Sequence, residues 1–256
     1  MKEDFPEVEY FVNMVESGLG ISYNNKYFEP EYPFYAGDKF FEVFSIPLIS
    51  GVDSLALKEP FTVVLSESYA KKIFGDEDPM GKIIKQVDIR DFKVTGVFKD
   101  LPDNSHLAID LLYSFETYVS LTSPESRTAW QWDGFLNYVK LRPGTDVELI
   151  SEKFPEFIDR RAGEELKEYN AGMEFILQPL TQIHLISDFR HEIKPNGDKN
   201  ATYFLLVIGM FVLLLAWINY INLTTARSMS RAKEVGIRKV MGVYREQLLG
   251  QFKIES

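Results

Sequence analysis

The longest apolar stretch of the sequence lies near its C-terminal end, where residues 201–226 carry no charged side chain. From Tyr203 to Leu223 almost every side chain is apolar, whereas an ordinary surface helix carries only an apolar stripe. A helix over this segment extends about 30 Å, which matches the hydrocarbon core of a bilayer. The pattern therefore predicts one transmembrane helix over residues 203–223.

A helical stripe follows this stretch, within residues 227–252. Apolar side chains recur at i, i+3, i+4, i+7 and i+11, with charged residues on the other faces: Ile237, Val240, Met241, Tyr244 and Leu248. Gly242 lies inside the stripe, so one long helix and two short helices with a break both fit. An amphipathic basic helix that leaves a membrane is suited to lie on its inner surface or to bind a cytoplasmic partner.

The first 200 residues alternate between strand and helix patterns, which predicts a mixed α and β domain of fold class α+β. The first 60 residues are rich in aromatic residues and proline and predict short strands and loops. Further strands are predicted over residues 61–65, 92–98, 136–141 and 175–180. We expect a bulge at Gly96, and Pro179 restricts the last strand to an edge or an end.

Two helices of this domain are predicted from their end signals. Ser66 provides an N-cap for the first helix, and Gly75 ends it. Thr145–Glu148 is a capping box, and Pro155 should kink or interrupt the helix that follows. The expected buried faces of the two helices are Tyr69, Ala70, Ile73 and Phe74, and Ile150, Phe154, Phe157 and Ile158.

The charge distribution gives the predicted transmembrane helix an orientation. Residues 201–256 carry seven Lys or Arg and three Asp or Glu, so their net charge of +4 leaves −14 for residues 1–200. Five basic residues lie within about 15 residues after the span and three within that distance before it, so the positive-inside rule favours a cytoplasmic C-terminus and an external domain. The acidic body opposes nucleic-acid binding because it would repel phosphates.

An external domain needs a route across the membrane. Residues 1–6 carry acids where a secretory signal has basic and then apolar residues. We therefore expect that an earlier membrane helix lies outside this chain and that the chain is a fragment; the alternative is that the span itself acts as a late anchor. Cysteine is absent, which rules out disulfides and thiolate zinc sites.

No pattern of catalytic residues stands out, so we expect that the protein is not an enzyme and that it binds no cofactor or metal. Gly75–Ile83 departs from a phosphate loop in its glycine spacing, in its acidic residues and in having isoleucine where magnesium needs Ser or Thr. Trp130–Trp132 is expected in a core or rim rather than at a ligand. The three histidines are scattered and form no metal-binding spacing: His106, His184 and His191.

Three residues of the predicted span depart from pure apolarity: Gly209, Asn219 and Asn222. Small and polar residues let membrane helices approach closely and form interhelical hydrogen bonds. The asparagines could instead reach the membrane interface, where Trp217 and Tyr220 also fit. Both interpretations stay open.

Several segments resemble the MacB/FtsX-like permease subunits of ABC transporters. Val63–Lys82, followed by Val94–Pro102 and Asn104–His106, is similar to the MacB-type extracytoplasmic core domain. Pro179–Leu185 is similar to the strand that closes that domain. Ile221–Gly242 resembles the second membrane helix and its cytoplasmic connection, and it is the most specific of these motifs.

The resemblance implies a permease that has four membrane helices, forms a dimer with a second permease subunit, and pairs with a cytoplasmic ABC ATPase. ATP would bind the ATPase partner, and its hydrolysis would move the extracytoplasmic domain to export or extract substrates. The residues that the resemblance implies for coupling to the ATPase are Arg231, Glu234, Gly236, Ile237, Arg238, Lys239 and Gly242.

These inferences divide the chain in two. Residues 1–198 form an extracytoplasmic core domain whose N-terminal part is incomplete, and residues 199–256 form an FtsX-like permease segment. The expected location is the bacterial cytoplasmic membrane, in contact with its lipid. The alternative function is a single-pass sensor or adaptor whose outer domain binds a ligand, because such a protein needs no further helices.

Overall fold

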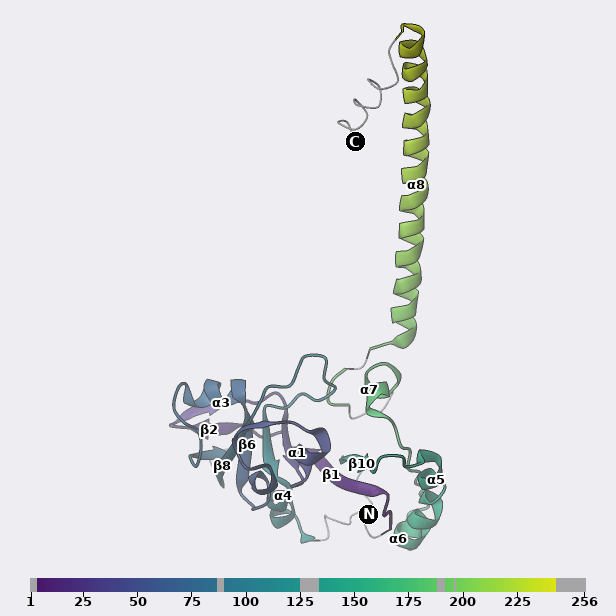
Figure 1. The fold of residues 1–256 in the computed structure, drawn as a ribbon. Helices are drawn as coiled ribbons and strands as arrows, with labels where there is room; N and C mark the ends of the chain where they lie inside the picture. The colour runs from purple at the N-terminus through teal and green to yellow at the C-terminus, as the bar shows by residue number, and fades with distance from the viewer. Residues whose placement is uncertain (1–3, 87–89, 125–133, 188–191, 196, 243–256) are drawn as a thin grey trace. The chain divides into compact units, whose positions relative to one another are not determined.

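The computed structural model describes residues 4–86, 90–124, 134–187, 192–195 and 197–242. Its contacts divide the chain into two units, Met1–Asn196 and Gly197–Ser256. The first unit holds a β-sheet with short helices, and the described part of the second is dominated by a single long helix (Figure 1).

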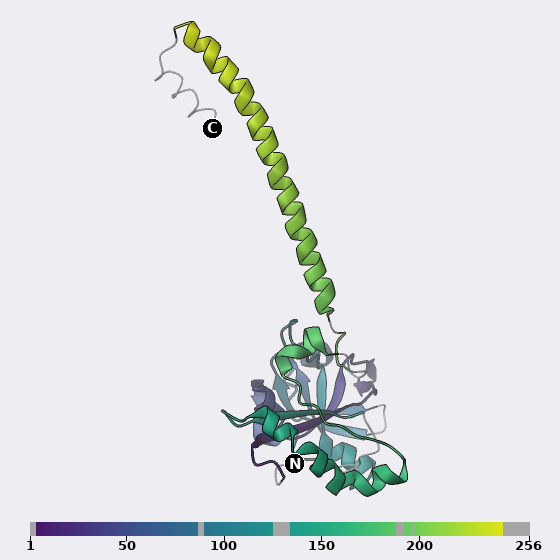
Figure 2. The ribbon, with the colours of Figure 1, turned by 90° about the vertical axis from the view of Figure 1, so that its right-hand side faces the viewer.

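A ten-stranded mixed sheet forms the centre of the first unit (Figures 1 and 2). Its strands are β1 Val8–Glu16, β2 Ile21–Tyr23, β3 Lys26–Phe28, β4 Pro33–Ala36, β5 Leu48–Gly51, β6 Thr62–Ser66, β7 Ile83–Gln86, β8 Arg90–Phe98, β9 Leu111–Ser114 and β10 Leu136–Leu141. The strand order is β10-β1-β4-β9-β6-β8-β7-β2-β3, and β5 also pairs with β8. The β4–β9 and β6–β8 pairs run parallel, so the predicted mixed α and β fold is confirmed.

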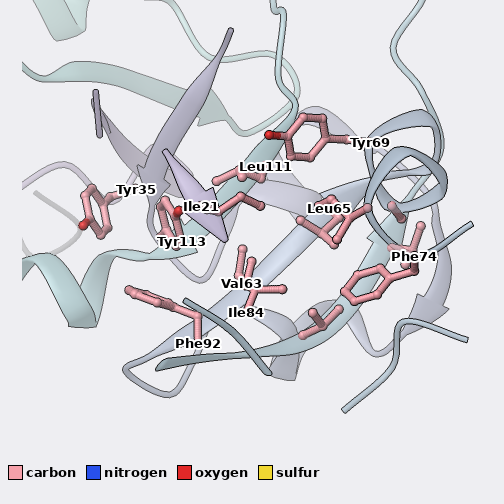
Figure 3. Close-up of a cluster of buried hydrophobic side chains, with 14 of the residues drawn as sticks. Ile21, Tyr35, Val63, Leu65, Tyr69, Phe74, Ile84, Phe92, Leu111 and Tyr113 are labelled. Atoms are coloured by element: carbon pink, nitrogen blue, oxygen red, sulfur yellow. The ribbon is translucent and has the colours of Figure 1, made fainter. Parts of the chain in front are cut away.

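Short helices cover both faces of this sheet. Val63 and Leu65 of β6 pack in one apolar cluster, whereas Val64 packs in the other, as the period of two in a strand requires. Helix α3 contributes Tyr69 and Phe74 to the first cluster, as Figure 3 shows. Helix α4 also contributes to the first cluster, and α1 and α2 contribute to the second. The helices of this unit are α1 Phe40–Phe44, α2 Asp53–Ala56, α3 Glu67–Phe74, α4 Phe115–Leu121, α5 Val147–Ser151, α6 Phe154–Glu168 and α7 Leu180–Ile186. The prediction of strands and loops alone for the first 60 residues missed α1 and α2.

The predicted helix after Ser66 is confirmed as α3. Ser66 Oγ accepts a hydrogen bond from the Tyr69 amide at 3.3 Å, and the apolar face expected for this helix is buried. Gly75 follows the last helical residue with φ 64°, which glycine adopts without steric cost. The strands predicted over residues 61–65, 92–98 and 136–141 are confirmed within two residues at their ends.

The irregularity expected at Gly96 is a bulge whose extra residue is Thr95. Val63 of β6 pairs with Val94, and the next residue of β6 pairs with Gly96. A Cβ atom added to Gly96 would lie 3.2 Å from the Ser50 carbonyl oxygen on the neighbouring β5. The close approach of β5 therefore explains why this position carries glycine.

The predicted strand over residues 175–180 is wrong, and so is the likeness of Pro179–Leu185 to a closing strand. Leu180–Ile186 is helix α7, and the residues directly before it form neither helix nor strand. Two side chains of the predicted strand, Phe175 and Leu177, pack on the apolar cluster of α6 instead, together with Met173. Pro179 lacks the amide hydrogen that a ladder uses, and its carbonyl oxygen accepts the Gln182 amide at 2.9 Å in the first turn of α7.

The helix predicted after residue 145 has a different cap from the one expected. Asp146 is the N-cap, since its carboxylate accepts the Glu148 amide at 3.0 Å, while Thr145 Oγ1 donates to the Arg142 carbonyl oxygen at 2.7 Å. The chain then divides into α5 and α6, and Pro155 lies in the first turn of α6, where no amide hydrogen is needed. The interruption predicted from Pro155 is therefore confirmed.

Candidate functional site

The candidate site lies on the second unit, on helix α8, Lys199–Val240. Asp198 caps its first turn, because one carboxylate oxygen accepts the Asn200 and Ala201 amides at 2.7 and 3.2 Å. The helix has 42 residues, so it extends roughly 63 Å, about twice the hydrocarbon thickness of a bilayer. Figure 1 shows it as one uninterrupted helix, so the predicted span and the start of the coupling segment are continuous.

The apolar part of α8 is exposed on all sides. Among the described residues, α8 is the one helix that is long and apolar enough to cross a membrane. An 18-residue window of α8 has a mean hydropathy of 2.5, and no residue in that window is buried. Leu205, Phe211 and Trp217 are 66%, 62% and 73% exposed. Apolar surface of this extent favours contact with lipid or with another helix over contact with water.

The three residues proposed for helix packing do not form one line on α8. At about 100° per residue, Asn219 and Asn222 lie about 60° apart on adjoining turns. Gly209 lies about 15 Å away along the axis from Asn219, and a Cβ atom added to it would meet nothing within 4 Å. The asparagines thus form one polar patch and the glycine a separate small-residue position. Their role in helix packing stays a prediction.

The residues proposed for ATPase coupling lie on more than one face of the helix. Arg231, Glu234 and Arg238 occupy positions i, i+3 and i+7, which share one face. Gly236 lies about 160° from Glu234 around the axis, and a Cβ atom added to Gly236 would meet no atom within 4 Å. The remaining two helical positions of the set, Ile237 and Lys239, are exposed. The coupling role of all these residues stays a prediction.

Helix α8 ends just before Gly242. Val240 is its last residue, and Gly242 has φ 88°, the left-handed conformation typical of the chain just after a helix. A single helix through the whole apolar stripe is therefore wrong. Tyr244 and Leu248, the last two residues of that stripe, lie outside the described residues.

The first unit contains a groove of about 490 Å³ between the turn after α1 and the loop that joins β8 to β9. His106 borders this groove, and its ring centre lies 6.2 Å from that of Phe44 and 5.7 Å from that of Tyr138. Burial lowers the pKa of His106, Glu192 opposes that shift, and Lys194 adds to it. The Nε2 atom of His106 is buried and has no hydrogen-bond partner among the described residues. The ring is therefore held mainly by packing.

The other chemical candidates of the first unit do not converge. Among the described residues, no group of three His, Cys, Asp or Glu side chains is placed to hold a metal ion. His184 is exposed on α7, whereas His191 and Trp130–Trp132 lie outside the described residues. In the Gly75–Ile83 turn, Lys82 pairs with Glu77, so the acidic turn is partly neutralised within itself.

Two contacts before α8 are new relative to the sequence-based expectations. The Lys194 ammonium donates to the carbonyl oxygens of Asp103 and Ser105 at 3.3 and 3.1 Å, and Asp198 caps α8. An aspartate directly before an apolar helix is a recognisable capping signal. The Lys194 contact had no such signal, because it joins residues 91 and 89 positions apart.

Comparisons with known proteins give consistent matches. The profile of the MacB-like periplasmic core domain matches residues 1–157. The macrolide export ATP-binding/permease protein MacB of Neisseria meningitidis is 26% identical over 249 residues, which cover 95% of this chain and 35% of that protein. The uncharacterized ABC transporter permease YknZ of Bacillus subtilis is 24% identical over 197 residues, 75% of this chain and 43% of that protein. The chain thus spans less than half the length of these relatives.

A solved structure shows the same kind of fold. It is a domain described as part of a permease from Porphyromonas gingivalis, with a TM-score of 0.55 and 31% identity. The match covers 62% of this chain and 67% of that domain. Sequence and fold comparisons therefore point to the same group of proteins.

Proposed function

This chain belongs to the family of the MacB-like periplasmic core domain, and we propose from that premise that it is part of a permease subunit of an ABC transporter. It is related over most of its length to MacB- and YknZ-type permeases. In this proposal a cytoplasmic ATPase subunit binds and hydrolyses ATP, and the permease couples hydrolysis to movement of an extracytoplasmic domain that exports or extracts substrates. The chain itself holds no cofactor and catalyses no reaction.

The proposed location is the cytoplasmic membrane of a bacterium, with the sheet domain outside and the C-terminal end of α8 in the cytoplasm. Basic residues follow the apolar segment of α8 and are exposed: Arg227, Arg231, Lys233 and Lys239. The positive-inside rule supports a cytoplasmic position for them. Membrane lipid and a second permease subunit would cover the apolar surface that the described chain leaves exposed.

The observation that supports coupling best is the continuity of α8. If the bilayer covers Tyr203–Leu223, the helix continues for about 25 Å beyond it to Val240. A hydrogen-bonded helix passes a displacement along its axis, whereas a flexible break at the membrane surface would absorb it. The face formed by Arg231, Glu234 and Arg238 would then carry the contact with the ATPase.

The test is a substitution on that face in the complete permease, reconstituted with its ATPase subunit. We expect Glu234→Ala to lower export per ATP hydrolysed while the sheet domain stays folded. Lys233→Ala is the matched control, because Lys233 neighbours Glu234 but lies about 100° away around the helix. Export per ATP at the wild-type level in the Glu234→Ala protein would contradict the proposal. A chain that inserts alone as a stable monomer and binds no ATPase would favour the sensor or adaptor instead.

A further inference from the structure

The residues that precede α8 are fixed to the sheet domain at a defined point. Glu192–Pro195, named here the strap, lies against the loop that joins β8 to β9. The Lys194 ammonium donates to the carbonyl oxygens of Asp103 and Ser105, at 3.3 and 3.1 Å. Ile193 packs against the apolar cluster that contains α1 and α2. A charged donor on two carbonyls and an apolar anchor beside it therefore hold the strap.

The loop under the strap leads directly into the centre of the sheet. It runs from Phe98, the last residue of β8, to Leu111, the first of β9, and both strands pair with β6. Within the loop, the Ser105 amide donates to the Pro102 carbonyl oxygen at 2.8 Å and closes a turn. A pull on the carbonyl oxygens that Lys194 holds therefore acts on two neighbours of β6.

The two hydrogen bonds of Lys194, named here the clamp, also help to limit the length of free chain between the sheet domain and α8. From Lys194 to Lys199, the first residue of α8, a fully extended chain reaches roughly 18 Å. If the whole strap were released, the next buried side chain upstream among the described residues would be Ile183 of α7, and the chain from there to Lys199 could extend roughly 55 Å. The contacts of Lys194 and Ile193 together thus shorten the tether about threefold and let a displacement of α8 reach the sheet.

We propose that Lys194 is the positioning residue through which movement of α8 is transmitted to the loop between β8 and β9. The inference rests on the proposed function, because the movement that it transmits comes from ATP hydrolysis by the partner. It adds a specific point of attachment: the strap holds the domain by the turn at Ser105, beside the groove that His106 borders.

The first experiment uses the full chain in lipid nanodiscs and follows amide hydrogen exchange. The reporters are the amides of Ser105 and Leu107, which donate within the loop to the Pro102 carbonyl oxygen and to Ser105 Oγ. We expect Lys194→Ala to speed their exchange roughly tenfold, because the loop loses two charge-assisted bonds. Lys194→Arg keeps a cationic donor and restores slow exchange. Lys199→Ala removes the same charge outside the strap and leaves exchange unchanged.

The second experiment uses the complete permease with its ATPase subunit. In the wild type, we expect ATP to change the exchange of the Ser105 and Leu107 amides. In the Lys194→Ala protein this response is lost, while the ATPase rate stays within about twofold of wild type; a merely structural contact would not separate the two readouts.

Each outcome bears on a different claim. Exchange in Lys194→Ala that stays at the wild-type rate in nanodiscs would overturn the clamp. An ATP response that persists in Lys194→Ala would overturn transmission through it. Exchange of the Ser105 and Leu107 amides that does not change with ATP in the wild type would overturn the proposed function and the transmission together. The nanodisc result would still decide whether the strap is attached.

Discussion

Gly236→Ala separates the role of this glycine in the helix from its role toward a partner. Glycine inside a helix is less favourable than alanine by about 1 kcal/mol, because its backbone loses more freedom on folding. A Cβ atom at this position would meet no atom within 4 Å in the described chain, so alanine adds no clash there. The substitution should therefore stabilise α8 by up to about 1 kcal/mol, and nothing inside the described chain requires the glycine.

If the ATPase approaches α8 closely at Gly236, the added methyl group separates the two surfaces. We expect the helical circular dichroism signal of the Gly236→Ala protein to equal or exceed that of the wild type. Export per ATP in the complete transporter should fall about tenfold, which corresponds to a lost contact of about 1.4 kcal/mol. Ser230→Ala is the control, because it also raises helix propensity but lies outside the proposed contact set.

A Gly236→Ala transporter with a more stable helix and undiminished export per ATP would contradict a close contact with the ATPase at Gly236. In that case the glycine would have no close partner, and the coupling contact would have to lie on the Glu234 face alone. A fall in export together with a loss of helix signal would refute the structural premise that alanine fits without strain.

Three further predictions concern the sheet domain. Leu65→Ala removes a fully buried side chain of β6 and should lower the free energy of unfolding in urea by about 2–5 kcal/mol. Gly51→Ala should also destabilise the domain, because Gly51 has φ 105° and its added Cβ would lie 2.6 Å from the Thr95 carbonyl oxygen. Gly144 also has a positive φ, but its added Cβ would meet nothing within 4 Å, so Gly144→Ala should lower the free energy of unfolding less in the same denaturation assay. Burial lowers the pKa of His106 in the folded protein, so the unfolded chain binds the proton more readily. The free energy of unfolding should therefore fall as the pH drops through about 6.5 toward the folded pKa. His106→Gln should flatten that pH dependence in denaturation series at several pH values.

Local signals predicted those parts of the fold whose determinants are close together in the sequence. The α3 helix follows from Ser66, from an apolar face with a 3.6-residue period and from Gly75, and the structure has all three. Residues 136–141 were predicted as a strand and form β10 with the predicted bounds. The apolar segment of α8 was predictable because no charge interrupts it.

The parts that could not be predicted depend on distant partners. The apolar residues at the start of the predicted strand, 175–177, are typical of a strand, but whether such a segment joins a sheet or packs on a helix depends on what lies beside it, here the cluster of α6. The Lys194 clamp likewise depends on carbonyl groups about 90 residues earlier in the chain. For the residues proposed to couple to an ATPase, the proposed partner surface belongs to another protein, so neither the sequence nor the fold of this chain tests them.

In the proposed topology, α8 crosses the cytoplasmic membrane and places the sheet domain and the basic end of the helix on opposite sides. The chain has no cysteine, so single cysteines introduced by Lys99→Cys and Lys239→Cys report two exposed positions without background. In cells with a permeabilised outer envelope and an intact cytoplasmic membrane, a membrane-impermeant maleimide should label the Lys99→Cys protein at once. It should label the Lys239→Cys protein only after that membrane is disrupted; labelling of both proteins before disruption would contradict the account.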